Sequence, residues 1–394
     1  LSIDAGGSWG RMQNNLPPVA VDDIAIHTRE NDLVLGTHGR SIWILDDITP
    51  LQELSDQVLA SAAHLFGSRR ATIWSMGMDW PFQPATFVAD NPPNAAAIRY
   101  YLREPVESGT TATGQNGGSD GSTLVTVSEI GPDGAVSPMG VRGRKLESMW
   151  DQESTPLRLE ILDSAGDVIR TLEPSNEVGV QQVLWDFRLE PAFEASSEGG
   201  GFRGGPPMGA GPRVLPGTYM ARLTVGDESH TREIEVRLDP RRNASRSDLV
   251  ERQKALMQVY ALAQPMRDAA QRLTSMDQRM NEIEKLVATA NLEEEDKAQI
   301  EGNIEDLSET LEELREDFSE ANRMGRQTGS IENWSGRPSA DQLWSIDQTW
   351  EVMPKVIERI NSMLTNRMPA LEALLSNIGV VPSLGEPIPI PRRR

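Results

Sequence analysis

The feature that most constrains the fold is a change in the spacing of apolar residues near residue 245. From residue 245 to residue 378, apolar residues recur every three or four positions, which is the spacing of a helix with one buried face. Before this point they alternate with polar residues over short runs, as in β-strands. With 394 residues, the chain is therefore predicted to be a multi-domain protein in which β-domains precede a helical domain.

Three helices are expected between residues 245 and 378, and the modest links between them predict an antiparallel bundle. In the first helix Asp277 interrupts the apolar seam, and Pro265 predicts a kink. Ser339, after a proline, predicts the start of the third helix. The seam of the second helix is unbroken and consists of Ile300, Ile304, Leu307, Leu311, Leu314, Phe318 and Ala321. The seams of the other two are expected at Leu256, Val259, Ala263, Met266, Ala270, Leu273, Met280, Ile283 and Val287, and at Leu343, Ile346, Trp350, Met353, Ile357, Ile360 and Leu364.

Two β-regions are predicted before the helices. Residues 1–48 contain a meander of three short strands, near residues 24–27, 33–37 and 41–45, which suggests a propeller blade or part of a sandwich. Residues 49–85 form a connector. Residues 86–240 are predicted to form one β-sandwich, with Gly-rich loop insertions at residues 107–155 and 192–212. Residues 379–394 form a Pro-rich tail.

The composition narrows the range of partners. The net charge of −21 repels nucleic acid and anionic membranes at long range, and nucleic acid is not expected as a partner. No apolar run approaches the ~20 residues that span a bilayer. The chain has no cysteine, and His27, His64 and His230 are too dispersed for a metal site, so no metal or cofactor is predicted. Because the chain starts at Leu1 without a basic segment, we expect the true N-terminus and any export signal to lie upstream.

Residues 2–9, Ser-Ile-Asp-Ala-Gly-Gly-Ser-Trp, fit the Asp-box pattern S-x-D-x-G-x-x-W. In this motif the Asp4 carboxylate is expected to accept backbone N–H groups of the turn, and Gly6 to adopt a left-handed conformation. Ser2 belongs to the same pattern, and Trp9 is expected to pack beneath a hairpin. These four residues are assigned a structural role.

Together with residues 23–27 and 36–47, the Asp-box resembles the last blades of the sortilin-type, BNR-repeat β-propellers of bacteria, which are often labelled glycosyl hydrolases. Residues 159–166, 185–186 and 215–219 resemble the Ig-like or fibronectin-type module that follows those propellers. The resemblance implies that the first region is an incomplete propeller, whose missing N-terminal blades are its partner within the same protein. It also implies that the Asp-box lies on the face opposite the usual ligand site.

The turn His38-Gly39-Arg40 is the candidate ligand-binding site, because the resemblance places it at the mouth of the central channel. Arg40 is suited to a bidentate pair with a carboxylate, and His38 to hydrogen bonding or titration. The alternative is that both residues fix the turn by bonding to neighbouring blades. Adjacent Asp46 and Asp47 point to opposite faces of a strand, which excludes them as a glycosidase pair and favours a turn or cap role.

The predicted function is that of an exported binding or scaffolding protein, periplasmic or extracellular, that acts on peptide or glycan. The alternative is a sialidase-like glycoside hydrolase whose catalytic residues lie in the missing N-terminal blades. Such a site needs several arginines and a tyrosine, whereas residues 1–48 supply Arg11, Arg29 and Arg40 but no tyrosine. No catalytic residue is therefore assigned within this chain.

Overall fold

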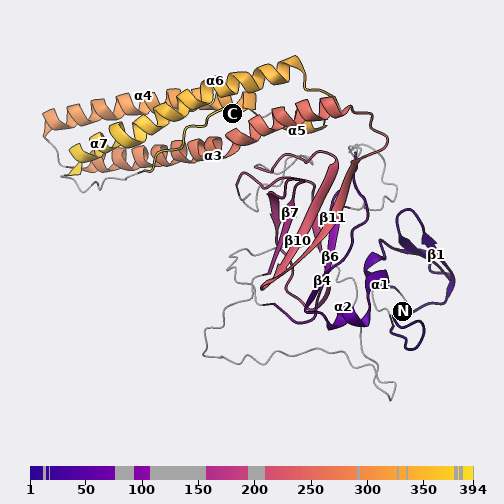
Figure 1. The fold of residues 1–394 in the computed structure, drawn as a ribbon. Helices are drawn as coiled ribbons and strands as arrows, with labels where there is room; N and C mark the ends of the chain where they lie inside the picture. The colour runs from indigo at the N-terminus through magenta and orange to yellow at the C-terminus, as the bar shows by residue number, and fades with distance from the viewer. Residues whose placement is uncertain are drawn as a thin grey trace, which may run out of the picture. The chain divides into compact units, whose positions relative to one another are not determined.

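A computed structural model of the chain has mixed β and α content, with a sheet curled into a half-barrel and several helices (Figure 1). It describes residues 1–11, 15–16, 18–75, 93–106, 157–193, 209–290, 293–325, 328–333, 336–376, 380 and 385–393. Within these residues every strand precedes the long helices, as predicted. Contacts divide the chain into two units: Leu1–Phe187 with Pro216–Arg242, and Arg188–Leu215 with Asn243–Arg394. The predicted insertion at residues 107–155 lies outside the described residues.

The three-strand meander predicted within residues 1–48 is confirmed. Its strands are β1 (Val21–His27), β2 (Asp32–Thr37) and β3 (Ile42–Leu45), and they form an antiparallel sheet in the order β1-β2-β3. Both outer strands of this sheet have an edge without a further strand among the described residues.

The remaining strands form a five-stranded sheet, β5-β11-β10-β7-β8, and a three-stranded sheet, β4-β6-β9. All pairs are antiparallel except β11 with β5. The strands are β4 (Ala63–Leu65), β5 (Ala71–Ile73), β6 (Ala96–Leu102), β7 (Leu157–Leu162), β8 (Val168–Leu172), β9 (Gly179–Trp185), β10 (Gly217–Val225) and β11 (Glu228–Leu238). The predicted connector holds β4, β5 and two short helices, α1 (Thr49–Glu53) and α2 (Asp56–Ala60).

These two sheets share one apolar core. Trp185 of β9 lies edge-on to Tyr219 of β10, with ring centroids 5.3 Å apart, and this contact crosses from one sheet to the other. Burial raises the pKa of Tyr219 to about 12 because the phenolate would lose its hydration. Fully buried side chains from both sheets complete the core: Ile98, Tyr100, Leu102, Leu159, Ile161, Leu223 and Ile234.

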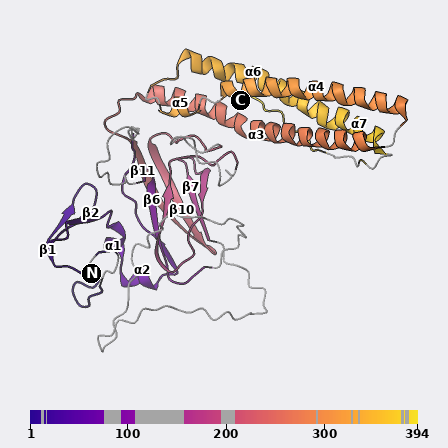
Figure 2. The same ribbon diagram turned by 180° about the vertical axis from the view of Figure 1, so that it is seen from behind.

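Three long helices pack around a second apolar core, and Figures 1 and 2 show them side by side from opposite directions. They are α3 (Arg246–Thr289), α4 (Glu294–Gly325) and α6 (Ala340–Ser362). The shorter elements are α5 (Thr328–Asn333), the π-helix η1 (Met363–Arg367) and α7 (Met368–Leu374). The start predicted at Ser339 is confirmed: its hydroxyl accepts from the N–H of Gln342, whose side chain accepts in return from the N–H of Ser339.

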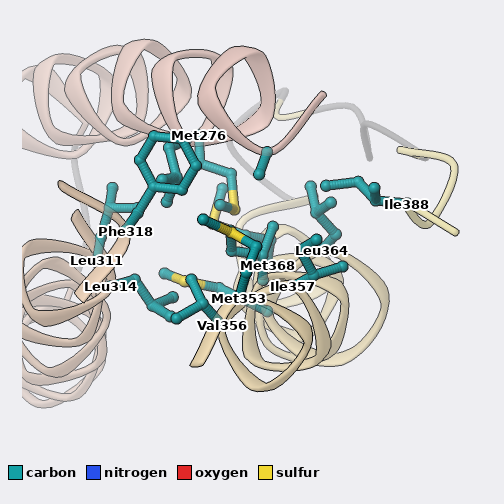
Figure 3. Close-up of a cluster of buried hydrophobic side chains, with 14 of the residues drawn as sticks. Met276, Leu311, Leu314, Phe318, Met353, Val356, Ile357, Leu364, Met368 and Ile388 are labelled. Atoms are coloured by element: carbon teal, nitrogen blue, oxygen red, sulfur yellow. The ribbon is translucent and has the colours of Figure 1, made fainter. Parts of the chain in front are cut away.

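The predicted seams are correct for α4 and correct in part for its neighbours. Every seam residue of α4 is buried, and Figure 3 shows Leu311, Leu314 and Phe318 meeting side chains of the other helices. In α6 the prediction is wrong at Leu343, which is 41% exposed. In α3 the buried positions before Leu273 include Leu262 and Ala269, whereas Ala263 is only half-buried.

The segment Arg188–Leu215, which includes the predicted insertion at residues 192–212, packs with the helical unit rather than with the sheets that flank it in sequence. The guanidinium of Arg188 donates to both carboxylate oxygens of Glu332 in α5, at 2.9 and 2.8 Å. Both side chains are buried. The same carboxylate accepts from the backbone N–H of Arg213 at 3.1 Å. This ion pair therefore joins positions 144 residues apart. Residues 194–208 lie outside the described residues.

Candidate ligand-binding site

The turn that carries His38 and Arg40 joins β2 to β3. It is closed by Thr37, whose N–H and hydroxyl both donate to the carbonyl of Ser41. Gly39 and Ser41 have φ values of 72° and 66°, so the chain reverses through left-handed positions, of which only the first is occupied by glycine. The indole N–H of Trp43 donates to the Arg40 carbonyl at 3.0 Å. The turn is therefore held by its own backbone and by Trp43.

The two candidate side chains have different surroundings. His38 Nδ1 lies 3.2 Å from a carboxylate oxygen of Asp22 in β1, and both side chains are exposed. Arg40 is also exposed, and among the described residues no carboxylate pairs with its guanidinium. The contact with Asp22 could not be predicted from local sequence, because the pairing of β1 with β2 creates it. The site thus combines an unpaired cation with an adjacent His–Asp pair.

The Asp-box forms a compact loop. The Asp4 carboxylate accepts from the N–H and the hydroxyl of Ser8 at 2.9 and 2.7 Å and from the hydroxyl of Ser2 at 2.7 Å. These hydrogen bonds hold the pKa of Asp4 well below its usual range, with the Ser8 hydroxyl contributing most. Gly6 has a φ of 95°, as expected. Trp9 is 69% exposed, so its ring is not covered by a hairpin as the motif predicts.

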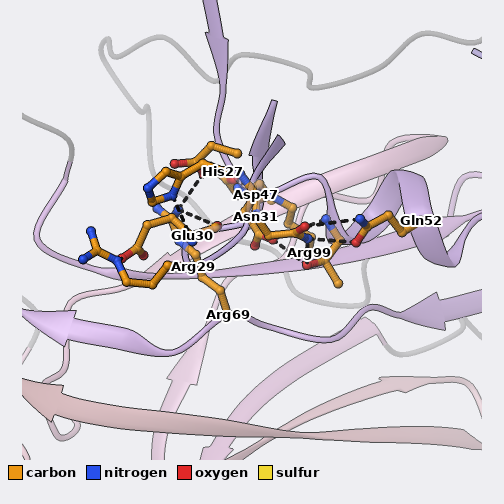
Figure 4. Close-up of polar contacts among 11 residues, drawn as sticks. His27, Arg29, Glu30, Asn31, Asp47, Gln52, Arg69 and Arg99 are labelled. Carbon is orange, nitrogen blue, oxygen red and sulfur yellow. Dashed lines mark hydrogen bonds and ion pairs between the residues drawn. The ribbon is translucent and has the colours of Figure 1, made fainter. Parts of the chain in front are cut away.

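A buried polar junction connects the β1–β3 sheet to the rest of its unit (Figure 4). Arg99 of β6 donates to Asp47 at 2.6 Å, and both side chains are almost fully buried. Asp47 also accepts from the N–H and hydroxyl of Thr49, at the start of α1. Arg69 pairs with Asp32 at 2.9 Å. The bonds to Thr49 agree with the turn or cap role predicted for Asp47, whereas its buried ion pair with Arg99 was not predicted.

The β1–β3 sheet is apolar on both faces, and both faces are exposed. Residues directly opposite in a ladder lie on the same face, so Ile24, Leu35 and Trp43 share one face. Ile42 and Ile44 of β3 lie on the other. Ile24 is 63% exposed and Ile42 67% exposed. A sheet with one buried and one solvated face would alternate apolar with polar residues, whereas a sheet covered on both faces does not need to.

No group of metal-ligating side chains is found in the part of the chain that the structure describes. In the same residues, each helix is too short or too polar to cross a bilayer. In comparisons with known proteins, no family model, no curated protein and no solved structure matches the chain.

Proposed function

We propose that the chain is the C-terminal part of an exported β-propeller protein that binds or scaffolds peptide or glycan. In this proposal β1, β2 and β3 belong to its last blade, the two β-sheets form an Ig-like sandwich, and the long helices form an antiparallel bundle. One observation carries the proposal: the β1–β3 sheet exposes isoleucines on both faces. Propeller blades are covered on both faces by their neighbours, so the missing blades would bury Ile24 and Ile42.

The ligand site of the proposal is the turn at His38 and Arg40. The Arg40 guanidinium is exposed, has no carboxylate partner among the described residues and stands on a turn fixed by the hydrogen bonds of Thr37 to the Ser41 carbonyl. A planar guanidinium with free N–H groups suits bidentate recognition of a carboxylate. Free carboxylates occur at peptide C-termini and on acidic sugars, which are the two ligand classes proposed. His38 and Asp22 add a hydrogen-bonding pair beside it.

The ligand site is tested with Arg40→Ala in the full-length protein, expressed in and purified from its native cell. The probes are an immobilised peptide with a free C-terminal carboxylate and an immobilised sialylated glycan. Loss of a charge-assisted contact of about 1.5–3 kcal/mol weakens binding of the recognised probe by about 10- to 100-fold. Arg29→Ala is the control, because Arg29 is an exposed arginine in the turn at the other end of β2 whose guanidinium already pairs with Glu30.

The melting temperature of the same variant separates the two roles of Arg40. A ligand role leaves the melting temperature unchanged, because an exposed turn buries little. A strut between blades lowers the melting temperature and leaves binding intact, and that result would end the ligand proposal.

The blade is tested with Ile42→Asp, made both in this 394-residue chain and in the protein as its own cell makes it. In this chain Ile42 is exposed, so the charge costs little stability. In the complete protein the same charge would be buried without a partner and would cost several kcal/mol. If the variant and the wild type have equal melting temperatures in both forms, the proposal that further blades cover this sheet is refuted.

A further inference from the structure

The Pro-rich tail lies against the helical unit through a defined set of contacts. The side-chain amide of Asn361 in α6 donates to the carbonyl of Ile388 and accepts from its N–H, both at 2.7 Å. The Ile388 side chain is buried in the helical core, where Figure 3 shows it beside Leu364. Farther along, Arg393 donates to Gln258 of α3 at 2.9 Å and pairs with Asp347 of α6. The helical unit therefore binds the tail in three ways: through backbone hydrogen bonds, through a buried apolar side chain and through a charged pair.

The spacing of these contacts fits an extended tail. Asn361 and Asp347 are 14 residues apart in α6, or about 21 Å along the helix axis. The five residues from Ile388 to Arg393 span about 16 Å when extended, and the long arginine side chain covers the remainder. The tail therefore runs along α6 in the opposite chain direction.

The sequence of the tail restricts it to an extended form before it docks. Pro387, Pro389 and Pro391 alternate with Glu386, Ile388 and Ile390. Each proline fixes its own φ near −65° and excludes the helical region for the residue before it. A segment that is already extended loses little conformational entropy on binding, which is how Pro-rich ligands bind grooves in other proteins.

A hollow lies between the docked tail and α3. It has a volume of about 690 Å³ and is lined by Glu386–Pro389 and by polar residues of α3 that include Asp268, Gln271 and Ser275. The pair between Arg393 and Asp347 is half-exposed, and exposed pairs contribute little to stability. The tail is therefore held mainly at one residue, Ile388.

We propose that the groove between α3 and α6 is a peptide-binding site and that the tail is its tethered occupant. Its ligand is an extended segment of another protein in which an isoleucine lies between prolines and an arginine follows. The Asn361 amide contacts only backbone atoms, which any extended segment offers. The Ile388 pocket selects the apolar side chain, and Gln258 and Asp347 lie where the arginine follows. In a chain with a net charge of −21, a basic ligand is also favoured at long range.

The test uses a labelled synthetic peptide with the sequence of residues 385–394, followed by fluorescence anisotropy. The chain without these ten residues binds the peptide saturably. The complete chain binds it at least about tenfold more weakly, because a tethered tail competes at an effective concentration on the order of 1 mM. In the truncated chain, Asn361→Ala removes two hydrogen bonds and weakens binding by about 10- to 30-fold. Asn281→Ala is the control, since the Asn281 amide bonds only within α3.

Two results would overturn the proposal: a truncated chain that keeps its helical content but does not bind, or one that binds a scrambled peptide equally well. If the truncated chain does not fold, the complete chain with Ile388→Ser takes its place. Its own tail no longer fills the pocket, so the added wild-type peptide binds and raises the melting temperature. Absence of both effects in that variant refutes the peptide site.

Discussion

We predict that Leu314→Ala lowers the free energy of unfolding of the helical unit by about 3 kcal/mol. Leu314 is 0% exposed and lies within the core that α4 forms with α3 and α6. The lost methyl and methylene groups contribute about 2 kcal/mol of transfer free energy, and the cavity left by neighbours that relax only in part adds the rest. The better helix propensity of alanine offsets at most a few tenths of a kcal/mol.

Leu343→Ala is the matched control for this prediction. Leu343 belongs to the predicted seam of α6, but it is 41% exposed and leaves no cavity when shortened. We expect it to cost less than about 1 kcal/mol. Urea-induced unfolding, followed by far-ultraviolet circular dichroism, measures the free energy of unfolding of each variant relative to the wild type. The same slope of free energy against urea concentration is used for all three proteins. Equal losses of stability for Leu314→Ala and Leu343→Ala would contradict the assignment of Leu314 to the core and of Leu343 to the surface.

Three further predictions concern charged and titratable side chains that are buried or partly buried. Arg99→Met leaves Asp47 buried without its cation and lowers stability by about 3 kcal/mol, measured as a lower melting temperature. Glu332→Gln weakens the pair with Arg188 and speeds proteolytic cleavage within the segment that this pair holds, whereas an unchanged rate would contradict the assigned contact. Burial holds the pKa of His230 below its ordinary value of 6.5, so between the two pKa values the unfolded chain binds more protons than the folded one. Stability therefore falls as pH drops below 6.5 through this window, and His230→Gln abolishes that part of a pH titration of stability.

The β-strands could be predicted because their signals are local. Leu157–Leu162 and Val168–Leu172 lie in the region predicted to be a β-sandwich, where the first run alternates apolar with polar residues and a turn separates it from the second. In that turn Asp163 accepts two backbone N–H groups and Gly166 has a φ of 89°. The seam of α4 was predictable for a similar reason. Leu343 was not, because spacing gives the face of a helix but not where neighbouring helices stop covering it.

The site was predictable only in its backbone. The turn at His38 and Arg40 follows from the two strands beside it, but the partner of His38 comes from a third strand. The ion pair between Asp47 and Arg99 joins residues 52 positions apart, and no local sequence pattern predicts such a pair. The exposure of Trp9 was also missed, because a motif gives the hydrogen bonds inside its loop and not what packs against it.

The ion pair between Arg188 and Glu332 has a consequence for the order in which the chain folds during synthesis. Ribosomes add about 5–20 residues per second, so the 144 residues between the partners take roughly 7–29 s to appear. All the described strands are synthesised before Glu332 emerges. The unit that contains these strands is therefore free to fold before the carboxylate partner of Arg188 has been made. During that interval residues 188–193 and 209–215 lack the helical partner with which they pack in the folded protein. A chaperone or a protease that acts on nascent chains would meet them before that contact forms.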